Sequence, residues 1–223
     1  MSEGAQGGAG SEDAQGEGVE ELLDALKSLR EKLTAAKASG DGLAEAHTLG
    51  EIGMLLWEAG QHREAIVSTR ASLREFSSLS DPKGEAKQLS RLGTMLFERG
   101  RIGKPLEFFE SSLRIYETIG DASGQANVQR KIGLVYEAQG DLSRALYTLG
   151  KALIGHRKLG AKRQEAIDMK HIALLFCQLG SEQEALSVLF SAAEILKSVN
   201  AEKELIEVKR LIDEMGGGAD QMH

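Results

Sequence analysis

The side chains best suited to catalysis or metal binding in this sequence are one cysteine, Cys177, and five histidines. The histidines are His47, His62, His156, His171 and His223. They are scattered along the chain, whereas a metal site needs convergent ligands at short spacings. No pattern typical of a phosphate-binding loop, a serine hydrolase or a zinc protease is present. We therefore expect structural or surface roles for these side chains, no catalytic residue, no metal, no cofactor and no enzymatic activity.

Composition narrows the class of protein further. The 223 residues are 41% hydrophobic and 27% charged, which is typical of globular chains, and their net charge is −7. An acidic chain lacks the charge footprint of a general nucleic-acid binder. The first 18 residues hold no basic cluster and no apolar run, and no stretch of the chain approaches 18 consecutive apolar residues. The sequence thus predicts a soluble, cytoplasmic protein with no nucleic-acid or membrane partner.

The elements that position any site are set by an internal repeat of 40 residues. Blocks 40–79, 80–119, 120–159 and 160–199 align without a gap. The columns of small residues are Gly60, Gly100, Gly140, Gly180; Ala46, Ala86, Ala126, Ala166; and Gly53, Gly93, Gly133, Ala173. Apolar columns, such as Ile52, Leu92, Ile132 and Ile172, run in the same register. Several matching columns in one register make the repeat a strong signal.

Each block has the pattern of two antiparallel helices. In block 120–159, apolar residues at helical spacing run to about residue 138, where Gly140 can end the helix in a left-handed conformation. Asp141 is then a natural N-cap for a second helix. Pro105 falls in the first turn of its helix, where its missing N–H costs little. The mid-helix Gly53 and Gly133 cost about 1 kcal/mol each against Ala, so we expect them to make room for the partner helix.

The two ends of the chain read as caps and tails. Residues 1–18 are glycine-rich and acidic, and we expect a disordered tail. Residues 19–39 match the second helix of a repeat, and 201–215 match a first helix whose small position holds Asp213. This last segment has the polar face of a terminal cap, and residues 216–223 are expected to be a second disordered tail. We therefore predict a complete all-α solenoid of about ten helices over residues 19–215.

These motifs resemble the tetratricopeptide repeat family. The family's first helix carries Leu-Gly followed by an aromatic residue, as in Ile132-Gly133 and Tyr136, and its second helix carries an Ala such as Ala145. The period of 40 differs from the usual repeat of about 34 residues, and the terminal proline is missing. The longer repeat is similar to that of kinesin light chains and polarity scaffolds. The resemblance implies an α-α superhelix whose first helices line a concave groove that holds ligand segments.

Helical spacing from the core columns places a mixed basic and apolar stripe on that groove. Basic charge gathers in the middle repeats of an otherwise acidic chain, beside large apolar side chains. The candidate groove residues are Met54, Trp57, Lys87, Arg91, Phe97, Asn127, Arg130, Lys131, Leu134 and Lys170. The alternative for Trp57 and Phe97 is packing against the neighbouring repeat.

The groove residues predict a non-catalytic adaptor that binds an acidic and apolar segment of a partner protein. Two alternatives stay open: a self-assembling scaffold, and a sensor of a peptide or small molecule. The carboxylate clamp of chaperone-binding relatives is not expected, because only Lys131 among its five matching positions keeps the required residue type. The sequence leaves open the partner, its pathway, the oligomeric state and whether the acidic tail occupies the groove.

Overall fold

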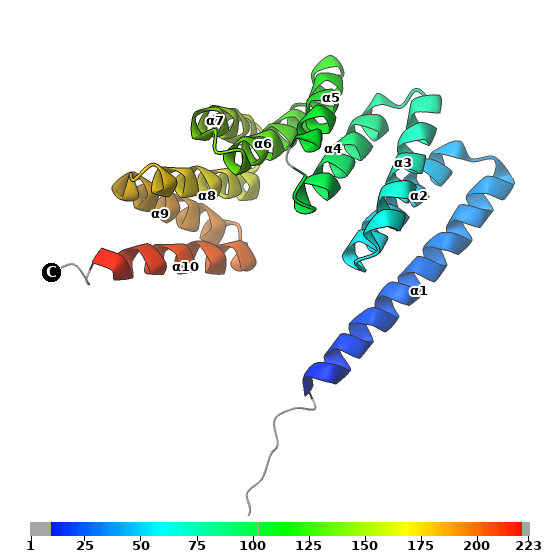
Figure 1. The fold of residues 1–223 in the computed structure, drawn as a ribbon, viewed down its shortest axis with the longest axis horizontal. Coiled ribbons are helices and arrows are strands. Elements are labelled where there is room, and N and C mark those ends of the chain that lie inside the picture. Colours follow the sequence, from blue (N-terminus) through cyan, green and yellow to red (C-terminus); the bar gives the residue numbers. More distant parts are fainter. Residues whose placement is uncertain (1–9, 102, 220–223) are drawn as a thin grey trace, which may run out of the picture. The chain divides into compact units, whose positions relative to one another are not determined.

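A computed structural model describes residues 10–101 and 103–219, with side chains for residues 21–101 and 103–216. These residues form ten α-helices and no strand, which confirms the predicted all-α fold (Figure 1). The helices are α1 (Gly10–Ser39), α2 (Gly42–Glu58), α3 (His62–Ser78), α4 (Pro82–Glu98), α5 (Lys104–Thr118), α6 (Ala122–Ala138), α7 (Leu142–Lys158), α8 (Lys162–Gln178), α9 (Glu182–Ser198) and α10 (Glu202–Ala219). Within these described residues, no helix is both long and apolar enough to span a bilayer.

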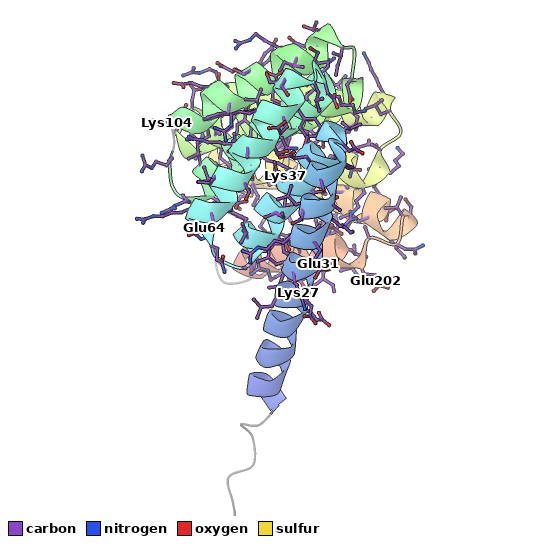
Figure 2. All side chains as sticks on the ribbon, turned by 90° about the vertical axis from the view of Figure 1, so that its right-hand side faces the viewer. Lys27, Glu31, Lys37, Glu64, Lys104 and Glu202 are labelled. Carbon is purple, nitrogen blue, oxygen red and sulfur yellow. The ribbon has the colours of Figure 1, made fainter. Side chains whose placement is uncertain are left out.

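The helices belong to two compact units. The first unit extends to Met95 and the second begins at Leu96, so that the division falls inside α4. In the first unit, α2 and α3 form a hairpin and α1 packs beside α2 (Figure 1). Lys37, labelled in Figure 2, pairs with Glu45 at 3.5 Å and joins the end of α1 to the start of α2. In the second unit, α6 pairs with α7, α8 pairs with α9, and α10 packs on α9.

Corners at intervals of twenty residues determine the lengths of the helices. A left-handed residue follows each helix from α1 to α9, for example Gly60 at φ 74° and Gly140 at φ 77°. Glycine reaches this region without a Cβ clash, and the same role falls to Ser80 and Asn200 at two corners. Asp141 accepts a hydrogen bond from the Arg144 backbone N–H at 2.9 Å, which confirms its predicted role as an N-cap.

Helix α5 is the exception to this regular length. It starts at Lys104 and has 15 residues, whereas the other helices from α2 to α9 each have 17. Pro105 lies in its first turn, as predicted, where no intrahelical donor is lost.

The terminal helices extend beyond the bounds expected from the sequence. Helix α1 begins at Gly10, so residues 10–18 of the expected acidic tail have helical backbone, while residues 1–9 lie outside the described residues. Helix α10 continues to Ala219 instead of ending at 215, and residues 220–223 are likewise not described. Once a helix is nucleated by packing, each further residue adds a backbone hydrogen bond, and this favours extension past the packed part.

Mid-helix glycines bring the helices of each hairpin close together. A Cβ on Gly133 of α6 would lie 2.7 Å from Leu149 Cγ of α7, and one on Gly53 would lie 3.1 Å from the Ala65 carbonyl oxygen. Both contacts are to the partner helix of the same hairpin, which confirms the packing reason inferred from the sequence. The same principle acts between hairpins, because a Cβ on Gly84 would lie 2.5 Å from Cε1 of the fully buried Phe76.

The replacement Gly84→Ala should lower the free energy of unfolding by about 1–3 kcal/mol, because the added methyl group must displace the Phe76 ring. The matched control is Gly150→Ala in the middle of α7, where no atom lies within 4 Å of the added Cβ. This control should raise stability by up to about 1 kcal/mol through helix propensity. Urea denaturation followed by circular dichroism compares the two variants. Equal changes in both would contradict the close-packing argument.

Candidate functional site

The first helices of successive repeats contact one another through polar side chains. In the first unit, Arg91 of α4 donates from Nη1 to the Gly50 carbonyl oxygen of α2 at 3.2 Å. In the second unit, Lys170 Nζ of α8 lies 3.0 Å from Glu207 Oε1 of α10. Such contacts place the first helices of each unit along one wall, which we call the first-helix wall of that unit. All ten residues predicted for the groove lie on these helices.

The wall of the first unit brings Met54 and Arg91 together. Met54 is 39% exposed and lies in a depression of about 390 Å³ between α1, α2 and α4. The residues that line this depression are Ala25, Ser28, Leu29, Lys32, Glu51, Met54, Leu55, Glu58 and Arg91. Lys87 is exposed one turn before Arg91 on the same helix. The site therefore offers an apolar floor with both acidic and basic groups at its rim.

Trp57 belongs to the core of the first unit more than to its surface. It is half-buried and packs against a buried cluster that includes Leu26, Leu56 and Met95. Its ring also contacts that of His62 on α3, with ring centroids 4.3 Å apart. Its surroundings therefore match the packing alternative. Phe97, near the end of α4, is also half-buried.

The wall of the second unit gathers the remaining candidates on α6 and α8. Arg130 donates from Nη2 to Asn127 Oδ1 at 2.8 Å. Lys131 Nζ lies 5.8 Å from the centroid of the Phe109 ring, and Leu134 is half-buried one turn further along α6. Three basic side chains, Lys170 included, thus stand on the adjacent helices α6 and α8 together with an amide and an apolar group.

Two buried polar residues lie behind this wall, and neither was among the groove residues predicted from the sequence. Asp168 of α8 is fully buried, and its Oδ1 lies 3.4 Å from Arg130 Nε. Its Oδ2 lies 2.6 Å from Nδ1 of His156, which is only 1% exposed at the end of α7. His156 Nε2 and Asp168 Oδ1 are buried without a hydrogen-bond partner. The sequence signal was present, since His156 stands in the repeat column of Phe76, Tyr116 and Leu196.

The arrangement contains donors and charges for binding but no group of the kind that holds a metal. Over the part of the chain that the structure describes, no three His, Cys, Asp or Glu side chains converge on a possible metal position. Cys177 is half-buried with its Sγ 3.5 Å from Met215 Sδ, and burial is the main factor that raises the pKa of its thiol. A raised pKa disfavours the reactive thiolate.

Comparison with known structures places this fold among helical repeat proteins. BtubC from P. vanneervenii has a TM-score of 0.66 at 16% identity, with 91% of this chain and 93% of that chain covered. Aspartyl phosphate phosphatase F from Bacillus subtilis has a TM-score of 0.82 at 14% identity, with coverage of 92% and 55%. The Rap conjugation gene regulator of plasmid pLS20, in complex with the Phr* peptide, has a TM-score of 0.69 at 14% identity, with coverage of 96% and 64%.

Sequence comparison gives one family. No curated protein sequence matches the chain. The tetratricopeptide repeat family matches residues 85–155, a segment that runs from the first turn of α4 to the last turn of α7. The hairpins α2–α3 and α8–α9 on its two sides have the 17-residue helices of α4, α6 and α7, and they too end in left-handed corners. Residues 85–155 therefore match the tetratricopeptide repeat family, and the described helices share the helical-repeat fold of the similar structures.

Proposed function

We propose that this protein is a non-catalytic adaptor that binds an acidic and apolar segment of a partner protein along its first-helix walls. The observation that carries the proposal is the gathering of Arg130, Lys131 and Lys170 on two adjacent helices of a chain with a net charge of −7. The half-buried Leu134 adds apolar surface to the same wall. A structurally similar repeat protein, the Rap regulator of pLS20, was solved with a bound peptide, and this supports a peptide ligand.

The cations of the second unit differ in how readily they can serve a ligand. Lys170, whose side chain is 12% exposed, pairs with Glu207, whose side chain is 48% exposed and can turn into solvent when another carboxylate takes its place. Arg130 faces Asp168, whose side chain has no exposed surface and cannot leave. A ligand carboxylate can therefore replace Glu207 at Lys170, whereas at Arg130 it must share the guanidinium with Asp168. This difference makes Lys170 an exchangeable contact and Arg130 a fixed one.

The surroundings of His171 support a locally positive wall. Burial, followed by the charges of Lys170 and Arg130, lowers the pKa of His171 to about 4, while Glu207 acts in the opposite direction. Its imidazole is therefore neutral at neutral pH, when it can offer one donor and one acceptor to a ligand. Burial is the larger cause of this shift, and the charges of Lys170 and Arg130 add to the cost of a further positive charge.

Charge reversal on the walls should weaken partner binding. The double variant Arg91→Glu, Lys131→Glu should lower the amount of partner recovered by affinity capture about tenfold or more, because an acidic ligand then meets repulsion. Mass spectrometry of the captured proteins identifies which ones are lost. The control is Arg74→Glu, Lys158→Glu, which makes the same charge change at exposed positions on the second helices α3 and α7. Equal recovery with both variants would argue against the first-helix walls.

Stability should fall as the pH is lowered from about 6.5 to about 4. In this window the unfolded chain binds a proton at His171 that the folded chain does not bind, so the free energy of unfolding rises with pH. The full contribution, present above pH 6.5, is at most roughly 3 kcal/mol. The variant His171→Gln should lose this part of the slope in urea denaturation between pH 4.5 and 7. An unchanged slope, or a His171 ring resonance that titrates near 6.5 by NMR, would contradict the lowered pKa of His171.

A further inference from the structure

The repeat register shows that the core of one repeat has been altered in a specific way. The last turn of each second helix from α3 to α9 carries a buried side chain at the same repeat position. These residues are Phe76, Tyr116, His156 and Leu196, and none is more than 8% exposed. Three of the four repeats thus use an aromatic or aliphatic group there, while the repeat of α7 uses an imidazole.

A second core column changes on the next helix, α8, at the start of the following repeat. Its residues on the first helices are Thr48, Gln88, Val128, Asp168 and Val208, all of them buried. The one carboxylate in this column, Asp168, is also the residue that contacts His156, with 2.6 Å between Oδ2 and Nδ1. A contact this short between a ring nitrogen and a carboxylate oxygen requires a proton between them. The two polar replacements therefore form one hydrogen-bonded unit inside the core.

Packing alone does not explain this polar pair. Where the column holds Phe76 or Tyr116, glycine follows eight residues later, at Gly84 and Gly124, because the ring occupies the space of a side chain. After His156 the corresponding residue is Gln164, so the smaller imidazole leaves room for a side chain. The next repeat fills the same two columns with Leu196 and Val208. An aliphatic pair thus fits this core, and burying a carboxylate in place of one costs stability.

The His156–Asp168 pair contacts Arg130 on the first-helix wall. Asp168 Oδ1, which has no hydrogen-bond donor, lies 3.4 Å from Arg130 Nε, and the Arg130 side chain is 14% exposed. Asn127 Oδ1 accepts from Arg130 Nη2 at 2.8 Å. The guanidinium therefore has a buried carboxylate in ion-pair contact at Nε and donates a hydrogen bond to an amide from Nη2. Its neighbour one repeat later, Lys170, pairs only with the half-exposed Glu207 among the ion pairs of this region that the structure describes.

We propose that Asp168, itself oriented by His156, is a positioning residue that fixes the Arg130 guanidinium on the first-helix wall for a carboxylate of the bound segment. The proposal rests on the proposed function, since the ligand is the same acidic segment. Beyond that function, we infer that the core residues His156 and Asp168 make Arg130 the basic residue that meets the segment in a fixed geometry. An arginine held in this way loses little side-chain entropy on binding, in contrast to a free lysine.

The test removes the polar pair and keeps Arg130. The double variant His156→Leu, Asp168→Val copies Leu196 and Val208 of the next repeat, so we expect it to fold with an equal or higher urea midpoint. The direct readout is the Nε–Hε NMR resonance of Arg130, assigned with Arg130→Gln. In the wild type this resonance should be shifted and slow to exchange with water. In the double variant it should move to the position and exchange rate of solvent-exposed arginines such as Arg74.

Two further variants keep this readout interpretable. Asp168→Asn retains the size of the side chain and removes its charge, so it supplies the measurement if the double variant fails to fold. Thr48→Val changes the same column in the first unit and should leave the Arg130 resonance where it is. An unchanged Arg130 resonance in both the double variant and Asp168→Asn would overturn the positioning role.

Binding is measured separately with a fluorescein-labelled dodecapeptide that carries two Glu and two Leu residues in a Gly/Ser background. Its affinity should fall about tenfold in the double variant and in Arg130→Gln alike. Full affinity in the double variant, with Arg130 released, would overturn the link between positioning and recognition. If the wild type fails to bind the peptide while Arg130 is released in the double variant, the ligand class of the proposed function is wrong and the positioning of Arg130 stands.

Discussion

The left-handed corner at every twentieth residue is the constraint on which the rest of this structure depends. A corner such as Gly140 ends one helix, and the following Asp141 begins the next, so that the helices have nearly constant length. Constant length keeps equivalent positions of successive repeats in register. Register, in turn, places every first helix on the same side of its neighbour within a unit. A change in spacing at one corner would rotate the following helices and divide the wall that they form.

Close packing turns this register into specific contacts. Gly133 lets α6 and α7 approach until Leu149 occupies the place of a side chain, and Gly124 does the same for the ring of Tyr116. Because interiors are packed to crystal-like density, a ring and a facing side chain cannot share one space. The smaller ring of His156 follows the same rule, because it leaves room for the larger residue Gln164 where Tyr116 requires Gly124. Between repeats, the size of the buried ring and the size of the residue that faces it therefore change together.

The basic residues of the wall differ in the burial of the carboxylates with which they pair. Arg130 and Lys170 occupy the same repeat position and carry the same charge, yet one faces a fully buried carboxylate and the other an exposed one. Burial decides which carboxylate can give up its partner when an acidic segment arrives. In the proposed function, Arg130 is the fixed cation of the wall and Lys170 the exchangeable one.

Much of this could be predicted from one sequence. The helices, their corners, the N-cap at Asp141 and the need for Gly53 and Gly133 all follow from local geometry repeated four times. These features depend on residues near in sequence, where backbone sterics and helical period act directly. The same helical period predicts which side of a first helix faces away from the core, and the placement of the candidate site on that side stays a prediction.

The partners of each side chain could not be predicted in the same way. Trp57, predicted for the groove, is half-buried and packs against the core cluster of the first unit. His156, one of five scattered histidines, meets a carboxylate twelve residues away. Such contacts depend on which rotamer fills the space left by several helices at once, and no single helix contains that information. The sequence by itself determined the repeat, its helices and the wall. The tertiary structure decided which charges on that wall are held and which are free to move, because burial is a property of the packed whole.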